Sequence, residues 1–175
     1  MAADRFIEEL GDQIGREFGA SQQYVAVAVY YDALTLPQLA AFFFRQALEE
    51  RDHAMMMVQY LLDAGVTPEI PGVAAPKSGF GDIAEPIRIA LEQERKVTDQ
   101  ISALAGVARE ANDFVSEQFV QWFLKEQVEE VATMSDLLAV AQRSIDRPME
   151  IEDYLAREQL AGDAADPTAP PVAGA

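Results

Sequence analysis

The 175-residue sequence contains no cysteine. Disulfide bonds and thiolate metal sites are therefore excluded, and nothing indicates an oxidising compartment. No run approaches the roughly 20 uninterrupted apolar residues of a membrane-spanning helix. The first residues, Met1-Ala2-Ala3-Asp4, have neither the basic nor the apolar segment of a signal peptide. We therefore expect a cytoplasmic protein without a membrane partner.

Basic residues are scarce as well, with 13 Lys and Arg against 30 Asp and Glu, which gives a formal net charge of −17. A surface this acidic repels phosphate backbones, so we expect no nucleic-acid partner. The same surface attracts cations, although ordinary solubility also explains such a charge. The sequence has no phosphate-binding glycine-rich loop and no internal repeat.

Apolar residues recur at helical spacing and predict four long helices followed by a short one. Their boundaries are marked by prolines in a first turn, a glycine stop and aspartate caps. The break before the second helix places Thr35 or Leu36 near its N-cap. The predicted helices span residues 4–33, 37–64, 82–111, 113–143 and 146–158, with N-caps at Asp82, Asp113 and Asp146, prolines at Pro37 and Pro148, and a stop at Gly65.

Residues 65–81 contain seven glycines and prolines and cannot form a regular element. A 28-residue helix is roughly 42 Å long, and about sixteen extended residues reach roughly 50 Å. The loop can therefore run the full length of a bundle and start the third helix at the opposite end. An all-α four-helix bundle with one long crossover between helices two and three is the ferritin-like arrangement. We expect one domain over residues 1–160 and a disordered Ala/Pro/Gly-rich tail over 161–175.

Each long predicted helix carries a metal-ligand side chain in the middle of its apolar stripe. Glu50, for example, lies seven residues after Phe43 and seven before Met57, so all three share one face. Four such residues lie 12 to 14 positions from the predicted helix starts and can meet at one level of the bundle. They are Glu17, Glu50, Glu94 and Gln127, and the fourth helix adds Glu130 one turn later.

Several carboxylates buried together repel one another and lose hydration, and a bound cation removes that cost. The pair Glu50-x-x-His53 places a carboxylate and an imidazole within reach of one ion. A single histidine on a core face is more often structural, but the matched carboxylates favour a metal site. Hard oxygen ligands with one imidazole suit iron, and also manganese or zinc.

Three segments carry a family resemblance: Arg16-Glu17-Phe18-Gly19-Ala20-Ser21-Gln22-Gln23-Tyr24, Glu49-Glu50-Arg51-Asp52-His53-Ala54 and Gln121-Trp122-Phe123-Leu124-Lys125-Glu126-Gln127-Val128-Glu129-Glu130. On these segments the sequence resembles prokaryotic non-haem ferritins, particularly those of actinobacteria, over residues 4–158. The resemblance implies a ferroxidase that oxidises ferrous iron with oxygen or hydrogen peroxide. It also implies storage of the ferric product inside a hollow shell of 24 identical subunits, with the fifth helix at the four-fold axis.

The resemblance further implies roles for individual residues. Glu17, Glu50 and His53 would hold the first iron. Glu50 would bridge to a second iron, and a third, more exposed iron would lie nearby. The second iron's other ligands would be Glu94 and Glu130, with Gln127 close by, and the third iron's ligands would be Glu49, Glu126, Glu129 and Glu130.

Several of these roles have competing interpretations. Tyr24 would donate a hydrogen bond beside the iron pair and act as a one-electron donor, or it only packs in the core. Glu126 and Glu129 fall on the flank of the apolar stripe, where a solvated helix face is the alternative. Glu117, near the start of the fourth helix, is a candidate for a channel that admits iron.

Two related ferritin classes and one unrelated class, a structural bundle, compete with this interpretation. Bacterioferritins bind haem and use two Glu-x-x-His motifs with a Met directly after the first Glu. Here only one histidine exists and Arg51 occupies the Met position, so we expect no haem. DNA-protecting mini-ferritins place iron across a dimer interface and lack a fifth helix. A purely structural bundle would leave the buried carboxylates without compensation.

Overall fold

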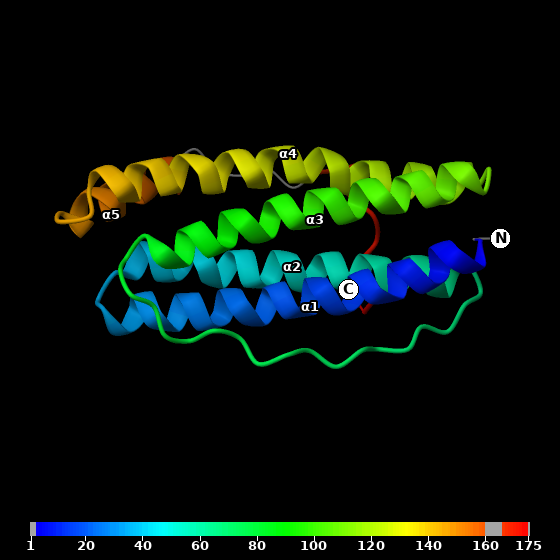
Figure 1. The fold of residues 1–175 in the computed structure, drawn as a ribbon, viewed down its shortest axis with the longest axis horizontal. Coiled ribbons are helices and arrows are strands. Elements are labelled where there is room, and N and C mark those ends of the chain that lie inside the picture. The colour runs from blue at the N-terminus through cyan, green and yellow to red at the C-terminus, as the bar shows by residue number, and fades with distance from the viewer. Residues whose placement is uncertain (1–2, 160–165, 175) are drawn as a thin grey trace.

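The computed structural model describes residues 3–159 and 166–174, and in these ranges the chain forms helices and loops but no strand. Four long helices lie side by side, and a short fifth helix lies across one end of the bundle (Figure 1). The all-α prediction is confirmed. The helices are α1 (Asp4–Ala33), α2 (Pro37–Asp63), α3 (Glu85–Glu110), α4 (Phe114–Arg143) and α5 (Pro148–Gln159).

The helix boundaries follow local chemistry. Leu36 is the N-cap of α2 with Pro37 in the first turn, and Gly65 ends that helix at a φ of 78°, where a side chain is disfavoured. Asp113 caps α4 by accepting the amide of Ser116 at 3.2 Å. None of the long helices, nor α5, is long and apolar enough to cross a membrane in the described parts of the chain.

The start of α3 differs from the prediction that Asp82 is its N-cap. The Asp82 carboxylate accepts the amides of Ala84 and Glu85 at 2.8 and 2.7 Å, which closes a turn before the helix begins. The helix then starts at Glu85 with Ala84 as its N-cap. Asp82 thus accepts hydrogen bonds from backbone amides two and three residues later, as an N-cap does. It does so from a turn that precedes the helix, and the helical pattern alone does not reveal this turn.

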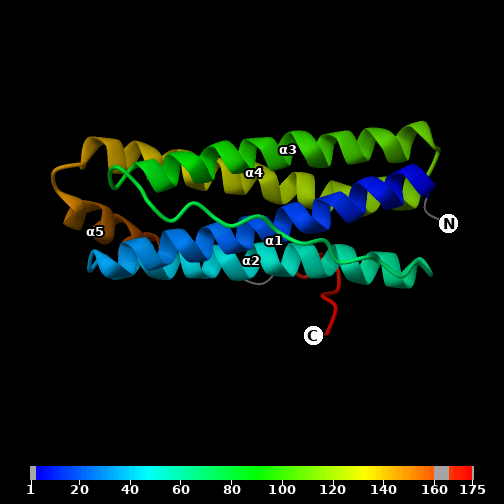
Figure 2. The same cartoon turned by 60° about the horizontal axis from the view of Figure 1, so that its bottom comes forward.

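The loop between α2 and α3 runs the length of the bundle along α1, as predicted from its reach (Figures 1 and 2). It is attached at three positions eight residues apart on α1. Pro71 lies over Gly15, Gln23 exchanges hydrogen bonds of 2.9 Å with the backbone of Lys77, and the Tyr31 hydroxyl donates to the carbonyl of Ile83 at 2.6 Å. Because of this crossover, α2 and α3 point in the same direction.

The hydrophobic core is divided into two clusters along the bundle axis. One cluster, around Tyr31 and Phe43, lies toward α5; the other, around Phe6 and Ile14, lies toward the N-terminal end. Between them the core contains a band of buried polar side chains at mid-helix. That band comprises Gln13, Glu17, Gln46, Glu50, His53, Glu94 and Gln127.

The short helix α5 is attached to α2 by a buried carboxylate. Glu152 is 4% exposed, and its two oxygens accept the amides of Gln38 and Leu39 at 2.8 and 2.9 Å. These amides belong to the first turn of α2, where no helical carbonyl is available to them. The charge also lies at the positive end of the helix dipole.

Candidate metal centre

Three ligand groups from two helices converge in the polar band. Glu17 comes from α1, and Glu50 and His53 come from successive turns of α2; their ligand atoms all lie within 4.8 Å of one another. All three side chains are almost fully buried. One oxygen of Glu17 and one of Glu50 are buried without a hydrogen-bond partner. Two unsatisfied carboxylate oxygens beside an imidazole are a ligand set that a cation can satisfy.

Neighbouring side chains hold these ligands in place. Gln13 donates to Glu17 at 2.7 Å, and Arg16 in turn donates to Gln13 at 2.9 Å. The rings of Trp122 and Phe123 meet the His53 imidazole edge-on, at centroid distances of 5.8 and 5.6 Å. A ligand whose rotamer is fixed by such neighbours loses little freedom when it binds a metal.

Glu94 of α3 completes the band from the opposite side. The Tyr24 hydroxyl donates to one oxygen of its carboxylate, and the Gln127 amide approaches the other at 3.4 Å. Gln127 is itself oriented by Thr98, whose hydroxyl donates to its side-chain oxygen at 3.0 Å. Side chains from α1, α3 and α4 therefore meet at the same level as the Glu50 carboxylate.

The electrostatics of the band favour protons in the absence of a cation. Burial, followed by the charges of Glu94 and Glu17, raises the pKa of Glu50 well above its ordinary value. Burial also raises the pKa of Glu94 to about 7, although the Tyr24 hydrogen bond opposes the rise. Burial lowers the pKa of His53, so its imidazole is neutral near pH 7 and free to bind a metal. A cation entering this site would displace protons from the carboxyl groups.

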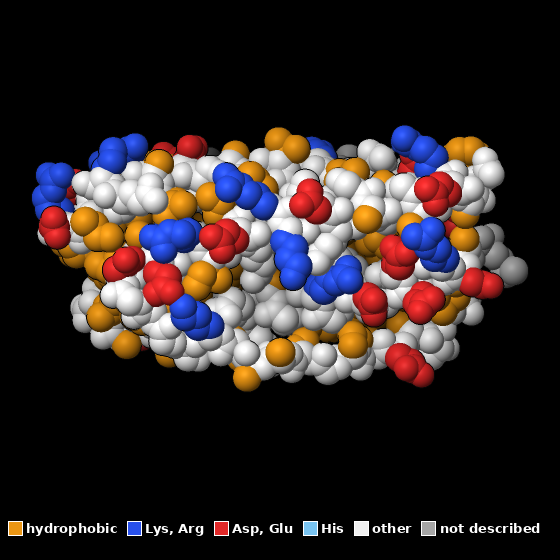
Figure 3. All heavy atoms as spheres, viewed as in Figure 1, with side chains coloured by type: hydrophobic (Ala, Val, Ile, Leu, Met, Phe, Trp, Pro, Cys, Tyr) orange, Lys and Arg blue, Asp and Glu red, His pale blue; other side chains and the backbone are white. Residues whose placement is uncertain are grey.

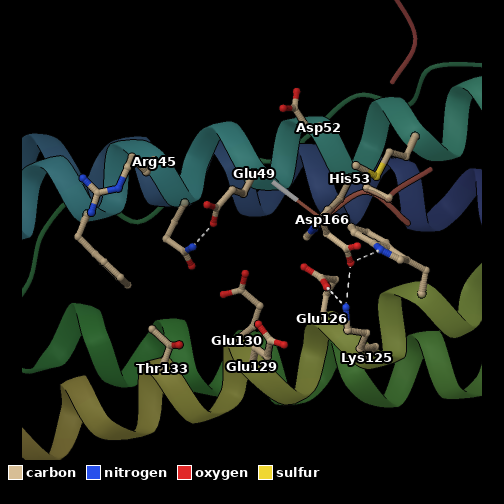
Figure 4. A pocket seen from close by; sticks show the side chains of 15 residues that line it. Arg45, Glu49, Asp52, His53, Lys125, Glu126, Glu129, Glu130, Thr133 and Asp166 are labelled. Carbon is tan, nitrogen blue, oxygen red and sulfur yellow. Dashed lines mark hydrogen bonds and ion pairs between the residues drawn. The ribbon is translucent and has the colours of Figure 1, made fainter. Parts of the chain in front are cut away.

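A pocket of about 490 Å³ opens between α2 and α4 beside this band. Figure 4 shows Glu49 on α2 facing Glu129 and Glu130 on α4 across the pocket, with Glu126 about one turn earlier on α4. Glu49 and Glu129 are exposed, whereas Glu126 and Glu130 are half-buried. Burial raises the pKa of Glu130, and the charges of Glu94 and Glu49 add to the rise. Glu130 thus lies between the buried band and the open pocket.

Part of the C-terminal tail lies against this pocket. Asp166 accepts hydrogen bonds from the Trp122 indole at 3.2 Å and from Lys125 at 2.8 Å, and the amide of Ala173 donates to the carbonyl of Met55 at 3.3 Å. Within the tail expected to be disordered, residues 166–174 contact α2 and α4 through one carboxylate and several small apolar residues. The remainder of the predicted tail lies outside the described residues.

A family model described as a ferritin-like domain matches residues 7–144 of the chain. The chain belongs to the ferritin family. This ferritin is 55% identical to Ferritin BfrB of Mycolicibacterium smegmatis over 97% of its own length and 93% of the relative's. It is 39% identical to the bacterial non-heme ferritin of Staphylococcus aureus over 75% and 80% of the two chains. The predicted resemblance to prokaryotic ferritins is confirmed.

A solved structure agrees on the fold. The open pore ferritin of the archaeon Archaeoglobus fulgidus superposes with a TM-score of 0.85 at 26% identity, covering 90% of this ferritin and 98% of that chain. The four-helix bundle with a long crossover is therefore an arrangement that this ferritin shares with its relatives.

The structure places the sequence-predicted residues of this ferritin in two neighbouring groups. The first is the buried band with Glu17, Glu50, His53, Glu94, Gln127 and Tyr24; the second is the pocket with Glu49, Glu126, Glu129 and Glu130. Their roles as iron ligands stay predictions. Glu117, predicted at a channel, forms an ion pair with Arg109, with the guanidinium Nε 3.0 Å from its carboxylate.

Sequence reasoning missed three residues that orient the predicted ligands: Gln13, Gln46 and Thr98. Each lies one helical turn from a ligand, four residues before Glu17, four before Glu50 and four after Glu94. Gln13 and Gln46 are buried. The sequence carried no distinct signal for them, because Gln46 donates to Glu49 and Thr98 to Gln127 on another helix, and polar residues beside an apolar stripe are ordinary.

Proposed function

We propose that this ferritin oxidises ferrous iron at a di-iron centre in the buried band and stores the ferric product. The observation that carries the proposal is the pair of unpartnered, buried oxygens of Glu17 and Glu50 beside a neutral His53. The second iron would bind between Glu50, Glu94 and Glu130, with Gln127 as a weak ligand. The membership of the chain in the ferritin family supports iron as the substrate.

The chemistry follows from the ligand types. Two ferrous ions held side by side would each give up one electron, and with two protons they would reduce one oxygen molecule to hydrogen peroxide. Two further ferrous ions would each give one electron to that peroxide, which with two more protons yields two water molecules. Hard, anionic carboxylate oxygens stabilise the ferric product over the ferrous substrate. Tyr24 holds the Glu94 carboxylate through its hydroxyl. The burial of that hydroxyl raises the pKa of Tyr24 well above its ordinary value, which keeps the phenol protonated.

The remaining parts of the proposal concern the pocket and the assembly. Glu49, Glu126, Glu129 and Glu130 would form a third iron site on the way out of the di-iron centre. Twenty-four subunits would form a hollow cytoplasmic shell around the ferric mineral, without haem. The carboxylates gathered in the pocket favour a cation over an anion there.

Replacement of Glu50 tests the di-iron centre. We expect Glu50→Gln to lower the initial rate of ferrous oxidation in air by about 100-fold or more, because the shared ligand loses its charge. The rate is followed by the absorbance of the ferric product. Glu92→Gln on the exposed face of α3 is the matched control and should oxidise iron at the wild-type rate. A wild-type rate in Glu50→Gln, with the same particle size, would refute the proposed centre.

A further inference from the structure

Tyr60 of α2 is a half-buried tyrosine whose hydroxyl begins a chain of hydrogen bonds. The Tyr60 and Ser116 hydroxyl oxygens lie 2.7 Å apart, and the Ser116 Oγ atom lies 2.6 Å from a carboxylate oxygen of Asp113. A serine hydroxyl has one proton to donate, and an ionised carboxylate can only accept. Ser116 therefore donates to Asp113, and the phenol of Tyr60 donates to Ser116.

The two ends of this chain are a protonated phenol and an ionised carboxylate. Burial raises the pKa of Tyr60. Burial also acts to raise the pKa of Asp113, but hydrogen bonds from Ser116 and from the amide of Ala3 outweigh it and hold that pKa below its ordinary value. A phenol that can pass its proton to a base gives up an electron more readily, because the product is then a neutral radical. The chain is therefore built to let Tyr60 lose a proton and an electron together.

Ring contacts join the same tyrosine to the candidate metal centre. Tyr60 stacks on Phe119 with ring centroids 4.0 Å apart, Phe119 meets Phe123 at 5.2 Å, and Phe123 meets the imidazole of His53 at 5.6 Å. The spacing of the sequence produces this path, because residues seven apart share a helix face. Two turns of α2 separate His53 from Tyr60, about 10 Å along the helix axis. An electron can cross that distance through the packed rings.

The chemistry of the proposed centre requires an additional electron when ferrous iron is scarce. A single ferrous ion gives one electron to hydrogen peroxide, which breaks the O–O bond into hydroxide and a hydroxyl radical. A second electron, with two protons, converts both fragments to water. Tyr24 lies closer to the centre, but its phenol donates to Glu94, which is itself a predicted ligand. A carboxylate that binds a cation gives up its proton and does not take another, so Asp113 is the better acceptor.

We propose that Tyr60 is an auxiliary one-electron donor to the centre, and that its electron leaves through the rings of Phe119 and Phe123. Its phenol proton moves to Ser116 as the Ser116 proton moves to Asp113. This inference rests on the proposed function, since ferrous iron and peroxide react at that centre. One ferrous ion and Tyr60 each give one electron to hydrogen peroxide, which takes two protons from solution and yields two water molecules. A further ferrous ion that enters the centre then reduces the tyrosyl radical, and the proton returns from Asp113.

Freeze-quenched electron paramagnetic resonance tests the donor. Anaerobic protein given a single ferrous ion per subunit and then hydrogen peroxide should show a tyrosyl radical, whose spectrum narrows when ring-deuterated tyrosine is incorporated. Tyr60→Phe keeps the ring but should lose most of this signal and release more hydroxyl radical to a spin trap. With ferrous iron in excess, Tyr60→Phe should oxidise iron in air at the wild-type rate. Tyr154→Phe makes the same change on α5, at the other end of the bundle (Figure 1), and as the matched control it should keep the radical.

Replacement of Asp113 separates the proton path from packing. Asparagine caps a helix as well as aspartate does and can still accept from Ser116, but its amide does not take up a proton. In Asp113→Asn the radical should form about 100-fold more slowly or less than that, because a positioned proton acceptor typically contributes this much to a step that moves a proton. A purely structural role of Tyr60 predicts the wild-type rate, since the helix and the rings are unchanged.

Three results would overturn the inference and leave the di-iron proposal standing, provided that excess ferrous iron is still oxidised. They are the absence of a tyrosyl radical in the wild-type protein, an undiminished radical in Tyr60→Phe, and formation at the wild-type rate in Asp113→Asn. A radical located on Tyr24 or Trp122 gives the second of these results. A wild-type protein that oxidises no ferrous iron in air would instead refute the proposed function, and the role of Tyr60 with it.

Discussion

Individual side chains in the polar band are held by hydrogen bonds that a cation would have to rearrange. Glu94 accepts from Tyr24 on one oxygen and is approached by Gln127 on the other. These contacts only partly compensate for burial, since the pKa of Glu94 still rises to about 7. In the metal-free protein some carboxyl groups of the band are therefore protonated, and they would lose these protons when a cation binds.

The raised pKa of Glu94 makes the stability of the metal-free protein depend on pH. Below the ordinary pKa of 4.5 both the folded and the unfolded chain keep this proton. Between that value and about 7 only the unfolded chain loses it, so the free energy of unfolding falls as the pH rises and levels off above 7. We expect thermal unfolding, followed by circular dichroism with a chelator present, to show this fall. Removing the carboxyl group in Glu94→Gln should reduce the fall by about 1–3 kcal/mol per subunit.

The exposed residue Glu92 provides the comparison for this experiment. Glu92→Gln should show the same pH dependence as the wild-type protein, because an exposed carboxyl group has no burial to relieve. Equal slopes in Glu94→Gln and Glu92→Gln would contradict the assignment of the proton to Glu94.

The spacing of single residues predicted much of the site but not the side chains that support it. A ligand at the centre of an apolar stripe is conspicuous, as Glu17 and Glu50 are, because it interrupts a seven-residue apolar pattern. Gln13 and Gln46 lie on the edge of the same stripe, where a polar residue is ordinary. Only the packed structure shows that both glutamines are buried. It also shows that the amide of Gln13 donates to Glu17 and the amide of Gln46 to Glu49.

At the scale of elements, the long loop is attached to α1 by close approach as well as by hydrogen bonds. A Cβ atom at Gly15 would lie 2.6 Å from the Cγ atom of Pro71. Only a residue without a side chain allows the loop to lie this close to the helix. A glycine inside a helix is otherwise unfavourable, so its presence here follows from packing.

Two glycine replacements on α1 separate packing from helix propensity. Gly19→Ala places its methyl group where nothing lies within 4 Å, so it should raise the free energy of unfolding by about 0.5–1 kcal/mol. Gly15→Ala should lose this gain and lower stability by about 1–3 kcal/mol, because the ring of Pro71 must move. Chemical denaturation of both variants measures the difference. A gain in Gly15→Ala equal to that in Gly19→Ala would show that the loop does not rest on this position.

The elements themselves were largely predictable because apolar residues recur at helical spacing in all four long helices, and because the ends of α2 and α4 carry a proline, a glycine or an aspartate cap. The start of α3 was not, because Asp82 can cap a helix or close a turn with the same carboxylate. The placement of 166–174 was also out of reach. Asp166 finds Trp122 and Lys125 more than 40 residues away, and composition does not report such partners.

At the scale of the whole molecule, α5 is connected to the bundle mainly through its contact with α2. The buried Glu152 carboxylate joins the last helix to the first turn of the second, at the opposite end from the N-terminus (Figure 2). The contact is remote from the polar band. The attachment of α5 and the chemistry of the centre should therefore respond separately to mutation.

Replacement of Glu152 by glutamine keeps the shape of the side chain but removes its charge and one acceptor. We expect the free energy of unfolding to fall by about 1–2 kcal/mol, because two helix amides lose their anionic partner. Thermal unfolding measures the loss, and particle sizing reports whether the size of the assembly changes. The exposed Asp153→Asn on the same helix should match the wild-type protein in both measurements. If the two variants unfold at the same temperature, Glu152 does not fasten α5.

The surface of the molecule mixes both signs of charge in the view of Figure 3, although the formal net charge is −17. The pocket between α2 and α4 is instead lined by several carboxylates. Its lining also includes two basic side chains, Arg45 and Lys125. Acidic groups concentrated in a recess focus the field on cations more strongly than the same groups spread over a surface. If the proposed centre oxidises iron, the distribution of charge, more than its total, would direct ferrous iron toward it.

Trp122 is the one tryptophan of the sequence. Its ring touches His53, its indole nitrogen binds Asp166, and its side chain lines the pocket. Tryptophan fluorescence from each subunit therefore comes from one position, where the buried band, the pocket and the tail meet. Trp122 is thus an intrinsic fluorescent probe of this region, and a paramagnetic ion that binds nearby will quench its fluorescence without any attached dye.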